Sequence, residues 1–171
     1  ITLYYNKKYN LLIVHAITNT AKSEWEIASS IHQIADDLKA PTILSIEGVM
    51  GKDEKAKGLF YHAGNDTMKK TLEKCKIKPL KEGIVVGVTA ALLAKKQANF
   101  GAIFAETHSQ LPDSRAAAGV ITCLDKVLGL EVDSKPLLKQ AELFEAKLKN
   151  IMTQSQQAQT MQETKRVNYV G

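Results

Sequence analysis

Cysteine is scarce in this sequence. Its 171 residues include only two cysteines, Cys75 and Cys123, which lie far apart in the chain. A domain of this length can build its own core, so a disulfide scaffold is not expected. No second pair of ligand residues accompanies the two cysteines, which argues against a structural zinc site. We therefore expect two free, partly buried thiols in a reducing cytoplasm.

Long apolar runs and a strong charge of one sign are missing as well. No apolar run approaches the roughly 20 residues that span a bilayer, and the opening ITLYYNKKYN alternates like a β-strand rather than a secretory signal. The 23 basic and 18 acidic residues give a net charge of +5, and the lysines form scattered pairs such as Lys69-Lys70. This composition favours a cytoplasmic protein with neither a membrane nor a nucleic-acid partner.

Catalytic signatures are also missing. There is no nucleophile elbow, metal triad or phosphate-binding loop. The histidines His15, His32 and His62 are isolated from one another in sequence, and we expect each to be hydrogen-bonded or at the surface. The sequence thus predicts no enzyme, no cofactor and no metal.

Strand-like and helix-like segments alternate along most of the chain. Apolar runs predict strands at residues 1–6, 11–16, 41–47, 58–63, 84–87 and 102–105. Amphipathic or small-residue segments predict helices between them, the first opened by a capping box at Ser23 and Glu26. The alternation predicts an α/β fold with a largely parallel sheet, covered on both faces, in which residues 11–16 and 41–47 are buried strands. Residues 58–63 can instead pair antiparallel with a neighbour.

The sequence is organised around residues 101–138. An apolar strand leads into a polar turn, and a helix then opens at Asp113 and Ser114 after Pro112. Gly129 lies at the predicted end of this helix, and Asp133 and Pro136 indicate the start of a further helix.

The last predicted helix carries a seam with a seven-residue repeat. Its apolar positions are Leu137, Ala141, Phe144, Leu148 and Ile151. The same register then continues with Ser155, Ala158 and Gln162. We therefore assign residues 1–152 to an α/β domain that includes the first half of this helix, and residues 153–171 to a polar, mobile tail.

The turn after the strand at residues 102–105 is a candidate ligand site. In open α/β sheets, ligands bind at the carboxyl edge of the strands. Four side chains can converge there as base, acid and anion clamp: Glu106, His108, Asp113 and Arg115. The alternative is structural, with Glu106 paired to Arg115 and the loop fixing the start of the helix.

The stretch ETHSQLPDSRAAAGVITCLDKVLGLEVDSKPLLKQAE resembles the archaeal proteasome assembly chaperones, and the resemblance extends over nearly the whole chain. It implies a three-layer, nucleoside-phosphorylase-like domain without a catalytic site. It also implies a homo-oligomer that binds 20S proteasome α-subunits. Members usually carry a further N-terminal portion, and this sequence has no initiator Met, so we expect a fragment or a trimmed chain.

The C-terminal residues form a candidate docking peptide, since they follow a long polar run that no core requires. Its residues are Val167, Tyr169, Val170 and Gly171. Several proteasome partners insert tails ending in a hydrophobic residue, Tyr and one further residue between α-subunits. Here Tyr169 is third from the end, which leaves open whether the tail uses the same pocket or has no role.

Overall fold

The structure is a computed structural model that describes residues 1–16, 20–51, 58–95, 99–107, 113–133 and 135–168. Six strands and five helices are assigned within these ranges. They are β1 (Thr2–Asn6), β2 (Leu11–His15), α1 (Glu24–Asp37), β3 (Ile43–Met50), β4 (Leu59–Ala63), α2 (Asp66–Glu73), β5 (Lys78–Pro79), α3 (Gly87–Ala94), β6 (Phe100–Thr107), α4 (Ser114–Leu128) and α5 (Lys135–Asn168). The predicted α/β class is confirmed.

The main sheet is mixed, with strand order β3-β6-β4-β5. β3 and β6 are parallel, with Ile46 opposite Ile103, whereas β4 is antiparallel to β6 and places Tyr61 opposite the same residue. β5 pairs with β4 in parallel. Two of the three pairings in this sheet are parallel, so the prediction of a largely parallel sheet is confirmed only in part, and the antiparallel alternative for residues 58–63 was right.

Two apolar cores lie on opposite faces of this sheet. One joins β6 and β4 to α2 and α4 around Leu72 and Ile103. The other joins β6 to α1 and α3 around Ala28 and Phe104. β6 is the central strand and is buried over most of its length because helices cover both of its faces. Its sequence is accordingly almost continuously apolar.

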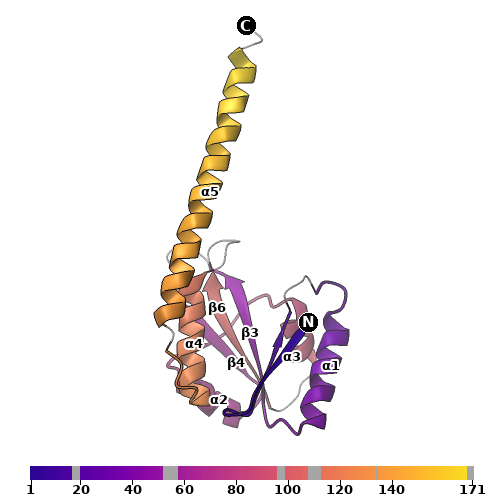
Figure 1. Ribbon diagram of the computed structural model, residues 1–171. Helices are drawn as coiled ribbons and strands as arrows, with labels where there is room; N and C mark the ends of the chain where they lie inside the picture. The colour runs from indigo at the N-terminus through magenta and orange to yellow at the C-terminus, as the bar shows by residue number, and fades with distance from the viewer. Residues whose placement is uncertain (17–19, 52–57, 96–98, 108–112, 134, 169–171) are drawn as a thin grey trace.

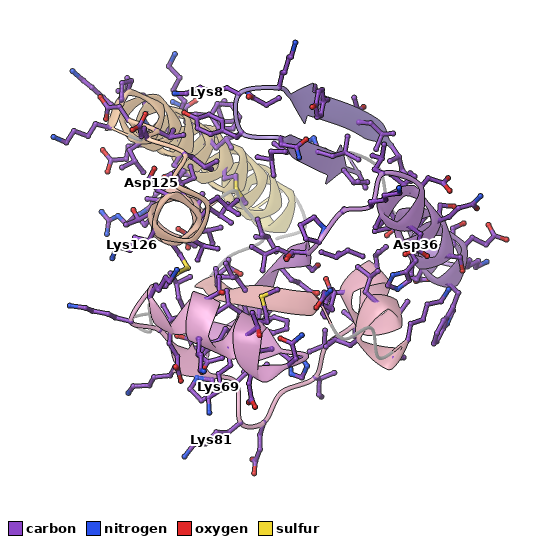
Figure 2. All side chains as sticks on the ribbon, turned by 90° about the horizontal axis from the view of Figure 1, so that it is seen from below. Lys8, Asp36, Lys69, Lys81, Asp125 and Lys126 are labelled. Carbon is purple, nitrogen blue, oxygen red and sulfur yellow. A yellow bond between two sulfur atoms is a disulfide. The ribbon has the colours of Figure 1, made fainter. Side chains whose placement is uncertain are left out.

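β1 and β2 form a separate antiparallel hairpin. The expectation of a strand at residues 11–16 buried on both faces was wrong, because Ile13 is half exposed. Lys8 in its turn forms an ion pair with Glu131 at 3.4 Å, beyond the end of α4 (Figure 2). β3 is likewise only partly covered, since exposed and half-buried residues alternate along its second half.

Three local predictions also need correction. Residues 84–86 are not a strand, and Ile84 is almost fully exposed because the chain only bridges β5 and α3 here. The capping box does not form, because the Ser23 side chain makes no cap hydrogen bond. His32 is buried in α1, and neither ring nitrogen has a partner among the described residues.

Cys75 and Cys123 form a disulfide, so the expectation of free thiols was wrong. α2 and α4 pack on the same face of the sheet, which brings the two Cα atoms to 5.1 Å. That distance lies within the range a disulfide spans. Their sequence separation of 48 residues gives no hint of this proximity.

α4 and α5 form an antiparallel pair. Asp133 accepts a hydrogen bond from the N–H of Lys135, where α5 begins. Gly129 ends α4 in the left-handed conformation with φ 61°, as its position predicted. α5 has 34 residues, and its C-terminal part rises away from the rest of the molecule (Figure 1). The mobility of residues from Thr153 onward stays a prediction.

Candidate functional site

β3 and β6 end at the same edge of the sheet, because they are parallel. Met50 lies opposite Thr107 at this edge, and the N–H of Gly51 donates to the carbonyl of Thr107. Figure 1 shows that α5 leaves the domain on the same side. The strand end that carries Glu106 and the described part of the predicted tail, residues 153–168, therefore lie toward one end of the molecule (Figure 1).

Glu106 fastens the start of β4 to the end of β6. Its carboxylate accepts a hydrogen bond of 2.7 Å from the N–H of Gly58, and its own N–H donates to the carbonyl of Gly58. A Cβ added at Gly58 would lie 2.6 Å from the carboxylate oxygen, so only glycine allows this approach. The carboxylate thus has a structural partner in the backbone of Gly58.

Asp113 caps α4. One carboxylate oxygen accepts from the N–H groups of Arg115 and Ala116, at 3.0 and 2.9 Å. These are two of the N–H groups that a helix start leaves unpaired, and the negative charge suits the positive end of the helix dipole. Asp113 therefore fixes the helix start, as the structural alternative foresaw.

Arg115 and His108 do not complete a catalytic group. The Arg115 side chain is exposed, and the single ion pair within the described ranges joins Lys8 to Glu131. The expected pairing of Glu106 with Arg115 is therefore not formed. His108 lies outside the described residues. Of the four candidates, Glu106 and Asp113 have backbone hydrogen-bond partners, and no two of the described candidate side chains are joined by a hydrogen bond or ion pair.

Sequence reasoning missed the residue that fixes α5. Glu145 of α5 accepts hydrogen bonds of 2.5 Å from both the N–H and the hydroxyl of Ser114. Ser114 is the first residue of α4 and is 5% exposed. Two carboxylates, from Asp113 and Glu145, thus meet the N-terminus of α4. Ser114 and Glu145 are 31 residues apart in sequence, so no local pattern could have indicated their contact.

On both sides of this anchor, α5 presents exposed apolar side chains. Phe144 is 54% exposed and Ile151 is 61% exposed, although both belong to the predicted seam. From Glu145 to Asn168 the helix advances by about 34 Å, at roughly 1.5 Å per residue. Of the predicted docking residues, Val167 lies within α5, whereas Tyr169, Val170 and Gly171 lie outside the described residues.

The described ranges hold neither a metal-binding cluster nor a helix that could cross a membrane. They contain no group of three or more His, Cys, Asp or Glu side chains placed to hold a metal ion. None of the helices they include combines the length and the apolar character that a bilayer span needs.

Comparison with known proteins gives a family match over most of the chain. The model of the PAC2 family matches residues 1–152. An uncharacterized protein of Methanocaldococcus jannaschii is 31% identical over 155 residues, which is 88% of this chain and 63% of the relative. The chain thus spans less than two thirds of the length of that relative.

Solved structures share the fold. Pyrococcus furiosus PbaA, described as an archaeal homolog of proteasome-assembly chaperone, superposes with a TM-score of 0.75 at 29% identity, covering 95% of this chain and 70% of its own. Pyrococcus furiosus PbaB, described as an archaeal proteasome activator, has a TM-score of 0.61 at 19% identity, covering 82% of this chain and 63% of its own. At that identity, the likeness to PbaB concerns the fold alone.

Proposed function

Because the chain belongs to the PAC2 family, we propose that it is a cytoplasmic, non-enzymatic protein with a chaperone-like role toward the proteasome. In this proposal it forms a homo-oligomer and binds 20S proteasome α-subunits, partly through residues 153–171. Its layering is then that of the nucleoside phosphorylases, without their catalytic site. The likeness to PbaA over 95% of the chain supports the assignment.

One observation carries the proposal: α5 is anchored at one point and then leaves the domain. Glu145 ties it to the start of α4, and the 23 residues from there to Asn168 extend the helix beyond the sheet edge (Figure 1). A core-forming helix would pack along its whole length, whereas this arrangement presents the C-terminal part of α5 at a distance from the domain. It suits a protein that reaches a partner.

The end of the chain has the chemistry of a docking peptide. Tyr169 combines a large apolar ring with one hydroxyl and few rotatable bonds, a combination found at binding hot spots. Val167 and Val170 flank it, and Gly171 follows. Ordering such a tether on binding costs entropy, which several tails on one oligomer would offset through avidity.

An enzyme at the loop edge is the alternative. It would need Glu106 or Asp113 as a free acid or base, but both carboxylates accept backbone hydrogen bonds. Arg115 is exposed and could act as an anion clamp, yet within the described ranges no hydrogen bond or ion pair joins its side chain to a catalytic partner. The observed contacts therefore favour the binding function over catalysis.

The first prediction tests the tail. Tyr169→Ala should weaken binding to purified proteasome α-subunits by about 1–3 kcal/mol, as truncation of an aromatic hot spot does. The melting temperature should stay unchanged, because the core clusters draw on residues that precede α5. Affinity is measured by calorimetry on the full chain, with Gln162→Ala as the matched control.

Other outcomes for Tyr169→Ala, and tests of the rival functions, would lead to different conclusions. Unchanged affinity for Tyr169→Ala would place recognition on the domain, and a lower melting temperature would show that the tail packs back on it. Parallel titrations with mononucleotides and with duplex nucleic acid test the rival functions. Phosphorolysis of nucleosides or turnover of ATP that Glu106→Gln abolishes, with the fold intact, would establish the enzyme instead.

A further inference from the structure

The disulfide joins two parts of the fold that differ in length and support. Cys75 lies just after α2 and leads through Lys76 into β5, and we call residues 66–80 the α2–β5 segment. Cys123 lies within α4, and both cysteines belong to the core cluster around Ile103. The sulfur–sulfur bond between them is visible in Figure 2. The disulfide therefore fixes the end of a short helix to a longer one.

Apart from the disulfide, short elements hold the α2–β5 segment on the sheet. α2 has eight residues, of which Met68 and Leu72 are buried. β5 pairs with β4 over two residues, and the N–H of Leu80 donates to the carbonyl of Tyr61 just beyond them. β6, in contrast, pairs with β3 over eight residues and has a core on each face. Because a short helix is marginal by itself, the α2–β5 segment is the part of this layer that can open without unfolding the domain.

Opening of the α2–β5 segment requires Cys75 to move away from Cys123. Cys75 lies between α2 and β5, and the Cα atoms of the two cysteines are 5.1 Å apart. With the disulfide closed, the segment can open only together with α4, whose first residue holds the anchor of α5. With two thiols in place of the disulfide, the segment can open alone. The state of the two sulfur atoms thus decides whether local opening is possible.

We propose that the Cys75–Cys123 pair is a redox-sensitive link that controls local opening of the α2–β5 segment. This inference rests on the cytoplasmic location in the proposed function, because a disulfide in that reducing compartment is usually transient and redox-sensing. A pair that can close there changes form as the balance of small thiols changes. β5 covers the edge of β4 with lysine and proline. Reduction would therefore also allow that edge to become uncovered.

The change of form is thiol–disulfide exchange with a low-molecular-weight thiol. The thiolate of this thiol attacks the sulfur of Cys75, because Cys75 is 8% exposed and Cys123 is 3% exposed. The bond between the two protein sulfurs breaks, and Cys123 leaves as a thiolate that takes up a proton. A second external thiolate attacks the external sulfur of the mixed disulfide and releases Cys75, which is protonated in turn. Two external thiols are then oxidised to one disulfide, and the protein holds two thiols.

The experiment compares the disulfide form of the full chain with the form reduced by a phosphine, using NMR hydrogen exchange under native conditions. On reduction, the protection of the Leu72 and Leu80 amides should fall at least about tenfold more than that of Ile103 in β6. Their exchange should then depend little on low denaturant concentrations, since local opening exposes little surface. The double variant Cys75→Ala with Cys123→Ala is the control, and its protection should be the same with and without the phosphine.

A second measurement tests whether the pair changes form in a thiol buffer. The full chain is equilibrated with glutathione, its free thiols are trapped by acid and alkylation, and they are counted by mass spectrometry. The pair should change from about 90% disulfide to about 90% dithiol over a roughly hundredfold change in the ratio of oxidised to squared reduced glutathione.

Two results would overturn the proposal. A disulfide that persists in reduced glutathione until the domain unfolds would be a structural bond only. An equal loss of protection at Leu72, Leu80 and Ile103 would show that the disulfide stabilises the whole domain and does not control one segment. Both measurements are independent of partner binding, so a failure to bind proteasome α-subunits would refute the proposed function and leave these results unchanged.

Discussion

At the scale of single residues, two carboxylates hold the end of the domain that faces the projecting helix. Glu106 ties the start of β4 to β6 through Gly58, and Glu145 ties α5 to Ser114. Hydrogen bonds in which a carboxylate accepts from backbone N–H groups are stronger than those between neutral groups. Both residues thus use their charge to join segments that are distant in sequence.

The second prediction concerns Glu145. Glu145→Gln keeps the size of the side chain but removes the charge that faces the N-terminus of α4, so the anchor should weaken by about 1–2 kcal/mol. Hydrogen exchange in residues 138–150 should become faster, more so at low salt. Glu142→Gln is the matched control, because Glu142 lies one turn away on α5 and is exposed. Equal effects of both variants would mean that Glu145 does not anchor the helix.

The third prediction concerns the disulfide between Cys75 and Cys123. It closes a loop with a sequence separation of 48, and the loss of chain entropy in the unfolded state should stabilise the fold by about 2–4 kcal/mol. Denaturant unfolding with and without a thiol-free reductant measures this difference. The double variant Cys75→Ala with Cys123→Ala should not respond to the reductant. If the reductant also leaves the unfolding midpoint of the wild-type protein unchanged, the prediction is contradicted.

Residue-scale features were predictable from the sequence only where the interaction is local. Asp113 caps the start of α4 and Gly129 ends it, each through hydrogen-bond partners within a few residues. Asp and Gly are residue types typical of helix starts and helix ends, respectively. The Glu145–Ser114 contact and the disulfide depend on two helices meeting on one face of the sheet. Spacing along the chain carries no signal for such pairs.

At the scale of elements, the sequence identified the central strand and the helices around it better than the outlying strands. β6 combines a long apolar run with flanking turns and is covered on both faces, as expected. Residues 84–86 have the same apolar character but lie exposed between β5 and α3. Composition could not separate these cases, because burial on both faces is decided by which strands become neighbours.

The fourth prediction is that α5 is stable only where it is supported. Residues 153–168 include a run rich in glutamine, and the predicted seam has become Ser155, Ala158 and Gln162. Isolated helices of about 15 residues are marginal in water. Amide hydrogens beyond Thr153 should therefore exchange at rates close to those of an unfolded chain, while those near Glu145 are protected. Uniform protection along α5 would show that the C-terminal part is held by a further contact.

At the scale of the whole molecule, the C-terminal part of α5 projects from the layered domain (Figure 1). Residues advance by about 100° around a helix, so the line through Phe144, Leu148 and Ile151 lies up to a third of a turn from Glu145, which faces α4. The seam is thus offset from the side that the domain covers. Phe144 and Ile151 are accordingly more than half exposed, which favours a partner helix over the chain's own core.

The fifth prediction is self-association through this seam. Sedimentation at micromolar concentration should show a closed, symmetric oligomer, the usual form of homo-oligomers. Phe144→Lys combined with Ile151→Lys should dissociate it, because both charges enter the apolar seam. Leu143→Lys is the control, since Leu143 is 59% exposed and lies about 100° from Phe144 on the side away from Glu145. Ile46→Lys should leave the oligomer intact, because β3 is a separate surface. A monomer at every concentration, or equal dissociation by Leu143→Lys, would refute a seam-mediated oligomer, and avidity would then play no part in binding by the tail.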